Sequence, residues 1–324
     1  MSSAIVWTES SVLATRDVTP SVREFTLATT SPSRPYAAGS HLQVELLING
    51  QPQIRSYSLI GQPDDGLYRI AVKQLPLGRG GSLAMWRLAP GERLCVSAPR
   101  NFFPLSLTAP GYLLLAGGIG ITPLVLMAQT LVERGAPVRL VQGARTVSEL
   151  AYGDVLRAAL GDQLTQVVDE RGERIDLAGE IAALPAGGQL YVCGPAPMLD
   201  AARQAWASAG RPAHDLRFET FGNSGQLAPQ PFGLKVPRQG VDITVAANES
   251  LLDALELVGV SALSNCRRGE CGLCALDVLT LDGVIDHRDV FLSTHEHQQN
   301  QRICVCVSRV VGSITLDIAY RSGA

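Results

Sequence analysis

Three cysteines within nine residues constrain the fold of this chain more than any other feature. Cys266, Cys271 and Cys274 lie in the segment NCRRGECGLC with the spacing C-x4-C-x2-C, and Cys304 and Cys306 follow some thirty residues later. Two irons bridged by sulfide need four thiolates, and this spacing with a distant fourth cysteine is typical of plant-type [2Fe–2S] sites. The pattern therefore predicts such a cluster near the C-terminus.

Other roles for these cysteines fit the sequence less well. A structural zinc site draws on two C-x2-C pairs or on histidines, and a Rieske cluster needs two histidine ligands close by. The odd total of seven cysteines argues against a secreted disulfide framework. Gly269 and Gly272 allow the backbone to approach the cluster sulfurs. We interpret His295 and His297, in STHEHQQNQR, as part of an exposed polar loop and not as metal ligands.

Composition limits the class of protein. The chain has 324 residues, is 46% hydrophobic and carries a net charge of −3, which suggests two or three packed domains. Two lysines and no basic stripe argue against nucleic-acid binding. The sequence MSSAIVWTESS lacks the features of a leader, and no apolar run is long enough to span a bilayer. We expect a cytoplasmic protein that acts without a membrane.

Three segments differ in pattern. Residues 1–105 contain short apolar stretches separated by turns, which predicts a β-barrel or sandwich. Residues 106–225 alternate strands with helices, which predicts a parallel, doubly wound α/β sheet. Residues 226–324 combine strands, one short helix and the cysteine loop. The segment GNSGQLAPQP, residues 222–231, is the expected linker.

A glycine-rich turn in the middle segment predicts a nucleotide site. LLLAGGIGITP places Gly117, Gly118 and Gly120 between a strand and a helix that begins near Pro123. Such a turn can present a helix N-terminus to a pyrophosphate, although an ordinary strand–helix turn fits equally well. Cys193, in YVCGP, ends a later strand at the same edge, where it is either buried or lines the nicotinamide pocket.

Two motifs in the first segment suggest a phosphate site. RSYSL begins at Arg55, and GRGGS ends at Ser82 just before an expected helix. Arg55 would supply charge and the glycines a nest of backbone N–H groups. Each motif alone also fits an ordinary strand or a flexible turn.

The motifs taken together resemble the phthalate dioxygenase reductase family, which includes vanillate demethylase reductases. RSYSL, GRGGS, GGIGITP, VCGP, FETFG and the cysteine cluster occur in the family's order over nearly the whole chain. The resemblance implies a flavin-binding antiparallel β-barrel, an α/β nucleotide-binding domain and a C-terminal β-grasp ferredoxin domain of the plant type.

The resemblance also implies roles for individual residues. Arg55 and the turn Gly80–Ser82 would hold the FMN phosphate, and Tyr57 and Ser58 would contact the flavin ring, with Ser58 near N5. Gly118, Thr122, Cys193, Gly194 and Pro195 would surround the nicotinamide dinucleotide. Glu219 and Phe221 would close over the flavin. The complete expected cofactor set also includes Ser56, Lys73, Arg79, Gly81, Gly117, Gly120, Pro123 and Arg145.

The implied chemistry is electron transfer from NADH through FMN and the [2Fe–2S] cluster to a separate terminal oxygenase of the Rieske type, with the reductase a monomer. The chain offers no evident non-haem iron triad, which favours a separate oxygenase. Two alternatives stay open: an electron donor to a haem-thiolate monooxygenase, and a non-catalytic iron–sulfur sensor or scaffold.

Two finer assignments follow the family pattern. The family mostly uses NADH, although Arg145, in QGART, could suit the 2′-phosphate of NADPH. For the fourth cluster ligand, RICVCVSR offers Cys304 and Cys306, two apart in a strand-like run, so they would point to the same face and periodicity cannot choose between them. Chain length after Cys274 favours Cys304, as in plant ferredoxins. The motif CVSR and its distance to the final strand favour Cys306. Because sheet pairing fixes that register, we predict Cys306 as the ligand.

Overall fold

The computed structural model describes residues 6–31, 34–48, 50–61, 66–76, 78–221 and 227–318. The chain forms two compact units, Met1–Pro76 with Gly81–Glu219, and Leu77–Gly80 with Thr220–Ala324. Part of the expected linker, residues 222–226, lies outside the described residues. Among the helices of the described part, none has the length and apolar composition that crossing a membrane requires.

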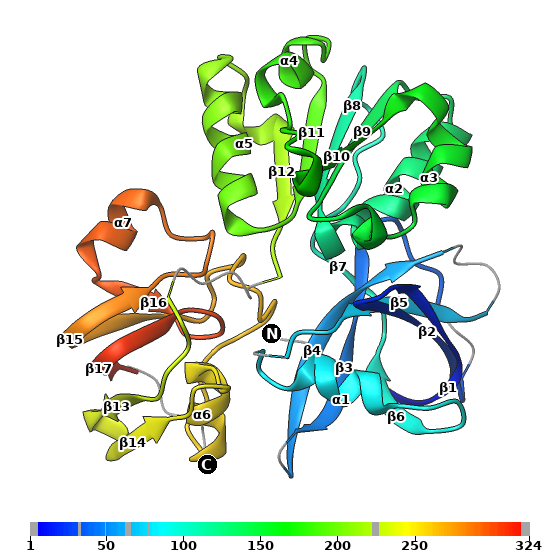
Figure 1. The fold of residues 1–324 in the computed structure, drawn as a ribbon. Coiled ribbons are helices and arrows are strands. Elements are labelled where there is room, and N and C mark those ends of the chain that lie inside the picture. The colour runs from blue at the N-terminus through cyan, green and yellow to red at the C-terminus, as the bar shows by residue number, and fades with distance from the viewer. Residues whose placement is uncertain are drawn as a thin grey trace. The chain divides into compact units, whose positions relative to one another are not determined.

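The first unit begins with an antiparallel barrel (Figure 1). Its strands follow the order β4-β5-β2-β1-β6-β3-β7, and an additional pairing of β3 with β4 closes it. The strands are β1 (Trp7–Thr19), β2 (Val22–Thr29), β3 (Ser40–Ile48), β4 (Gln51–Ile60), β5 (Tyr68–Lys73), β6 (Arg93–Ser97) and β7 (Arg100–Asn101). Alternate residues such as Phe25 and Leu27 on β2 point into the buried interior, as period-two patterning requires.

The same unit continues into a parallel sheet of order β10-β9-β8-β11-β12. All six residues of β8 are buried, because helices cover both faces of the sheet. In Figure 1, α2 and α3 lie on one face of this sheet and α4 and α5 on the other. The elements are β8 (Tyr112–Gly117), α2 (Ile121–Glu133), β9 (Val138–Ala144), α3 (Gly153–Leu160), β10 (Leu164–Val168), α4 (Leu177–Ala182), β11 (Gln189–Cys193), α5 (Ala196–Ser208) and β12 (Leu216–Glu219).

The second unit is built on a five-stranded sheet of order β14-β13-β17-β15-β16. β13 and β17 pair in parallel, whereas the other pairs are antiparallel. The elements are β13 (Phe232–Val236), β14 (Val241–Val245), α6 (Leu251–Leu257), β15 (Ala275–Asp286), α7 (Thr294–Gln299), β16 (Arg302–Cys304) and β17 (Arg309–Asp317). Leu251 and Leu255 of α6 share one buried core with the strands, so the expected three-part architecture is confirmed.

One short helix also belongs to the barrel region. Helix α1 spans Gly81–Arg87 and buries Met85 completely. The helix expected after GRGGS is therefore present. Its Ser82 Oγ accepts the backbone N–H of Leu75 at 3.0 Å, which holds the start of the helix against the end of the β5 segment.

Candidate functional site

Two loops meet where the parallel sheet reverses its strand order. β9 and β10 lie on one side of β8, and β11 and β12 lie on the other, so the reversal falls between β8 and β11. The glycine turn follows β8, and Cys193 ends β11 at the same edge. Ligands of open α/β sheets bind at this position, outside the carboxyl ends of the strands.

Glycine at position 120 permits the close approach of these loops. A Cβ added to Gly120 would lie 2.1 Å from the carbonyl oxygen of Cys193 and 2.9 Å from the nitrogen of Gly194. Real Cβ contacts with backbone atoms are never this short, so any side chain would push the loops apart. Gly117 is similarly crowded by Pro195 and Met198.

Helix α2 begins directly after the turn and has no acidic residue in its first turn. Gly120 is its N-cap and offers no side-chain acceptor, and the N–H of Ile121 donates to the carbonyl oxygen of Gly118 in the preceding turn. The positive end of the helix dipole still favours an anion at this point. Thr122 is buried and its Oγ1 donates to the carbonyl oxygen of Ile119 at 3.0 Å. Pro123 lies in this first turn, where its missing N–H costs no hydrogen bond, because the first N–H groups of a helix have no partner within the helix.

An acid that the sequence did not reveal lies beside the loop after β9. Arg145 is exposed, and its carbonyl oxygen accepts the N–H of Glu170 at 3.0 Å. The Oε1 atom of Glu170 in turn accepts the N–H of Val147 at 2.8 Å. Glu170 follows the neighbouring strand β10, so only strand order brings it beside Arg145.

Three of the predicted flavin-phosphate residues, Arg55, Gly81 and Ser82, belong to the first unit. Arg55 lies on β4, and its Nε atom would be 2.7 Å from a Cβ added to Gly81, so its side chain lies against that glycine. Gly80 belongs to the second unit and, with a φ of +79°, adopts the left-handed conformation that glycine favours. Ser56 and Tyr57, also on β4, are half-buried.

Ser58 and Glu219 bring the barrel and the parallel sheet to one point. Ser58 Oγ lies 3.4 Å from Glu219 Oε2, and these residues are only 4% and 1% exposed. Ser58 belongs to β4 and Glu219 is the last residue of β12. The contact places a hydroxyl and a carboxylate at the carboxyl edge of the sheet, beside the strand that ends in Cys193.

Three further residues predicted to bind a cofactor lie away from the Ser58–Glu219 pair in their contacts: Lys73, Arg79 and Phe221. Lys73 ends β5, and its Nζ lies 3.5 Å from Oε2 of Glu149, which belongs to the connection between β9 and α3. Arg79 belongs to the second unit, where its Nη1 donates to the Cys306 carbonyl oxygen at 3.3 Å. Phe221 is half-buried and also belongs to the second unit.

The cysteine loop brings four predicted ligands into one region of the second unit. Cys266, Cys274 and Cys306 are buried, whereas Cys271 is exposed. Gly269, with a φ of +76°, packs so closely that an added Cβ would lie 2.6 Å from Val307. A loop that wraps a cluster needs this kind of close approach.

The sulfur atoms fit the donor set of a metal cluster. Hydrogen bonds within the group lower the pKa of Cys271 to about 5 and that of Cys274 to about 4, and they raise the pKa values of their partners Cys266 and Cys306. The thiolate is the form of cysteine that binds metal. Cys274 Sγ lies 3.1 Å from Cys306 Sγ.

Cys304 and Cys306 differ in what faces them. Cys306 Sγ accepts the N–H of Gly269 and lies in the field of Cys266, so it faces the ligand loop. The pKa of Cys304 is raised by its hydrogen bond to Cys274, by burial and by the nearby Asp289 carboxylate.

One expectation about this segment is wrong. RICVCVSR was read as a single strand in which both cysteines face the same way. Strand β16 ends at Cys304, and Cys306 lies in the following turn. Ser308 N–H donates to the Cys304 carbonyl oxygen at 3.0 Å and helps to form that turn.

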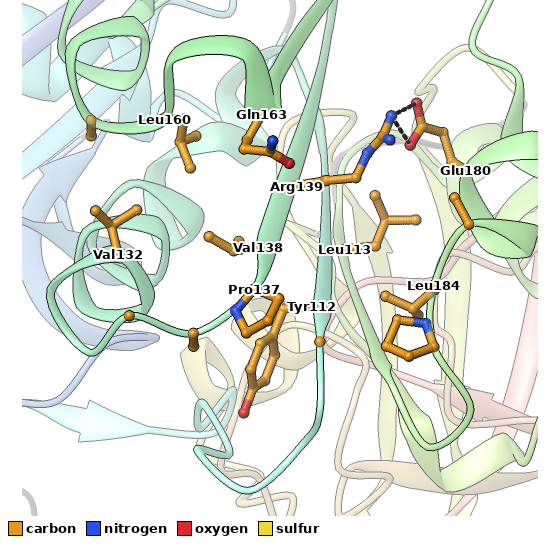
Figure 2. A pocket seen from close by; sticks show the side chains of 16 residues that line it. Tyr112, Leu113, Val132, Pro137, Val138, Arg139, Leu160, Gln163, Glu180 and Leu184 are labelled. Carbon is orange, nitrogen blue, oxygen red and sulfur yellow. Dashed lines mark hydrogen bonds and ion pairs between the residues drawn. The ribbon is translucent and has the colours of Figure 1, made fainter.

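The pocket in Figure 2 lies at the opposite edge of the parallel sheet from the switch point. It encloses about 500 Å³ and includes Tyr112 and Val138, the first residues of β8 and β9. Figure 2 shows the Arg139–Glu180 ion pair, at 2.9 Å, beside apolar side chains such as Leu184. It is therefore separate from the predicted nucleotide residues.

Three family models match successive parts of the chain. The oxidoreductase FAD-binding domain matches residues 9–103, and the oxidoreductase NAD-binding domain matches residues 114–204. The 2Fe-2S iron-sulfur cluster binding domain matches residues 234–311. The chain is thus an oxidoreductase with domains for a flavin, NAD and a 2Fe-2S cluster.

Relatives and solved structures of similar organisation cover nearly all of the chain. The heme-dependent oxidative N-demethylase beta subunit of Ectopseudomonas mendocina is 40% identical and covers 95% of this chain and 97% of its own. The toluene-4-sulfonate monooxygenase system reductase subunit of Comamonas testosteroni is 39% identical, over 87% of this chain and 89% of its own. The solved phthalate dioxygenase reductase has a TM-score of 0.80 and 29% identity, covering 96% and 98%. This chain therefore belongs to the phthalate dioxygenase reductase family.

Proposed function

We propose that this protein is the reductase component of a multicomponent Rieske-type oxygenase. It would take two electrons from NADH and deliver them, one at a time, to a separate oxygenase protein. The observation that carries the proposal is the joint presence of a dinucleotide switch point, the buried Ser58–Glu219 pair and a four-thiol cluster loop in one chain. The similarity to reductase subunits of oxygenase systems supports it.

A bound flavin would supply the change from two-electron to one-electron chemistry, because flavins can accept a hydride and release electrons singly. The residues of the chain position the reactants. The loops after β8 and β11 would hold the nicotinamide, and Ser58 would orient the flavin edge that receives the hydride. Burial of Ser58 and Glu219 keeps water from this point.

The cluster assignment uses Cys266, Cys271, Cys274 and Cys306. Cys306 is favoured because its sulfur accepts the Gly269 N–H and faces the loop that carries the other ligands. In this assignment Cys304 is a buried thiol behind the cluster. Exposure of Cys271 gives an acceptor protein access to one side of the cluster loop within the second unit.

We infer FMN as the flavin. The proposed site ends at one phosphate, held by Arg55, Arg79 and the turn Gly80–Ser82, and Arg55 already covers Gly81. The mass of flavin released by heat from purified protein tests this assignment. Stoichiometric FAD would overturn it, and FMN would support it.

We infer NADH as the preferred nucleotide. The Glu170 carboxylate accepts the N–H of Val147, two residues after Arg145, and is thereby held at this loop. A 2′-phosphate bound there would be repelled by the carboxylate as well as attracted by the arginine. Comparison of kcat/KM for the two nucleotides decides between them. In a Glu170→Gln variant, the discrimination against NADPH should fall.

A haem protein is the second candidate acceptor. The relative from Ectopseudomonas mendocina carries the name of a heme-dependent demethylase subunit, which favours this alternative over other acceptor types. Reconstitution with Rieske-type and with haem-thiolate oxygenases, measured as NADH-dependent product formation, separates the two. A protein whose flavin and cluster absorption NADH does not bleach would instead fit a non-catalytic sensor.

The proposal also includes the organisation of the chain. We place the flavin domain at residues 1–105, the nucleotide domain at 106–225 and the ferredoxin domain at 226–324, in a cytoplasmic monomer. Expression of residues 226–324 alone with iron and sulfide tests the last boundary. A folded, cluster-containing fragment is the expected result, and light scattering of the full chain tests the monomer.

A further inference from the structure

Two histidines and one aspartate form a compact group behind the cluster loop, within the second unit. His287 and Asp289 follow β15, and His297 lies on α7, so the group joins two segments that are separate in sequence (Figure 1). Their ligand-type atoms all lie within 4.8 Å of one another. STHEHQQNQR was expected to be an exposed loop, but residues 294–299 form a helix and His297 reaches Asp289.

The distances match those of a tetrahedral metal site. His297 Nε2 lies 3.2 Å from Asp289 Oδ2, and His287 Nδ1 lies 3.6 Å from Asp289 Oδ1. Two ligand atoms that are each about 2.1 Å from a tetrahedral zinc ion are about 3.4 Å apart. The two observed separations lie on either side of that value. The imidazole rings of His287 and His297 are stacked, with centroids 4.2 Å apart and planes at 18°, so one ring must turn before both ring nitrogens can point at one ion.

The environment of His287 leaves one ring nitrogen available to a cation. Its Nε2 lies 3.1 Å from Asn300 Oδ1, so in the tautomer whose Nε2 donates to this oxygen, Nδ1 presents a lone pair. Nδ1 is buried without a hydrogen-bond partner, and the His287 side chain is only 8% exposed. Metal-binding histidines are commonly oriented by such a hydrogen bond from the other ring nitrogen.

Asp289 is held in place by groups other than the histidines. Ser308 Oγ donates to its Oδ1 at 3.0 Å, and the Leu292 N–H donates to its Oδ2 at 2.9 Å. Its side chain is fully buried, so its negative charge lacks water to stabilise it. A buried carboxylate facing an unprotonated imidazole nitrogen is a favourable place for a cation.

We propose that His287, Asp289 and His297 bind one divalent transition-metal ion of the Zn²⁺ type, separate from the cluster. Imidazole and carboxylate ligands suit this class of ion, and three protein ligands leave a fourth position for water. The His297 side chain is 27% exposed, which provides an entry path from solvent. A bound ion would tie α7 to the segment that packs against Gly269 of the cluster loop.

The test is calorimetric titration of the flavin- and iron-loaded full chain with Zn²⁺, with iron content measured before and after. His297→Ala is the main variant, because this partly exposed side chain can be removed with little effect on folding. His295→Ala is the matched control, since His295 lies on the same helix and its ring bonds to the exposed Gln299 of that helix. His297→Gln checks that loss of the ligand, not of packing, is responsible.

The expected result is one Zn²⁺ per wild-type chain, unchanged iron content, and unchanged binding in His295→Ala. The dissociation constant should rise at least tenfold in both His297 variants. Absence of saturable binding in the wild type would overturn the proposal. So would equal affinity in His297→Ala, equal loss in His295→Ala, or binding that displaces iron from the cluster.

Discussion

Ser58 Oγ lies 3.4 Å from Glu219 Oε2 across 161 residues of sequence. The two side chains come from the barrel strand β4 and the sheet strand β12, and both are almost fully buried. A polar pair buried at the meeting point of two folded parts restricts how a flavin ring and a nicotinamide can lie there.

Ser58→Ala should slow reduction of the flavin by NADH about tenfold, the equivalent of about 1.4 kcal/mol for one lost hydrogen bond. Stopped-flow absorbance measures this rate directly. Glu219→Gln keeps the shape of the side chain and should slow the same step. Thr280→Val, which removes an exposed hydroxyl that bonds Thr315 in the second unit, is the matched control and should leave the rate unchanged. Wild-type rates in both site variants would contradict the assignment.

Gly120→Ala should destabilise the first unit by more than about 2 kcal/mol, because the new methyl would overlap the Cys193 carbonyl group. Gly120 has a φ of −61°, so the cost is crowding and not backbone strain. Urea denaturation followed by far-UV circular dichroism measures the free energy of unfolding.

Gly172→Ala is the control for that substitution. Gly172 has a φ of +72° in the left-handed region and nothing within 4 Å of an added Cβ, so only backbone strain of about 1 kcal/mol is expected. A Gly120→Ala variant no less stable than Gly172→Ala would show that the two loops can separate easily.

The fold could be predicted from local patterns because its main signals are local. GYLLLAGG, the glycine turn and PLVLMAQTLVERG give β8 and α2 through apolar periodicity and helix-start chemistry. The motifs GGIGITP and VCGP predicted that the loops after β8 and β11 lie at one edge of the sheet. How closely Gly120 approaches the carbonyl oxygen of Cys193 could be seen only in the structure.

What the sequence could not give depends on contacts between distant segments. Glu170 reaches the loop of Arg145 only because β10 lies beside β9. His297 looked like an exposed loop residue, yet Asp289 pairs with it across a turn and a helix start. Cys306 was expected in a strand, but a turn after Cys304 redirects its sulfur. Hydrophobic periodicity along the sequence does not predict which side chains from different segments come into contact.

Arg55→Ala and Arg79→Ala should each lower flavin content without unfolding the chain. Each removes a charge proposed to face the phosphate, and charge-assisted hydrogen bonds of this kind are worth about 1.5–3 kcal/mol. Flavin per chain after dialysis, with a melting curve for each variant, is the measurement. Arg93→Ala removes an exposed arginine paired with Glu9 and should retain all its flavin.

The two arginines can be distinguished further. Arg55 contacts the glycine turn, whereas Arg79 also donates to the carbonyl oxygen of Cys306. Arg79→Ala should therefore alter the EPR spectrum of the reduced cluster, and Arg55→Ala should not. Unchanged flavin content in either variant counts against the phosphate role of that residue.

Cys306→Ser should remove or severely destabilise the [2Fe–2S] centre, whereas Cys304→Ser should keep it and its electron transfer. Cys306 Sγ lies 3.1 Å from Cys274 Sγ and accepts the Gly269 N–H, so it belongs to the ring of sulfurs around the loop. Cys304 is equally buried but occupies the last position of β16, paired with Ala275. The two variants are matched in chemistry and differ by two positions. Iron content and low-temperature EPR measure the outcome, and loss of the cluster in Cys304→Ser with retention in Cys306→Ser would reverse the ligand assignment.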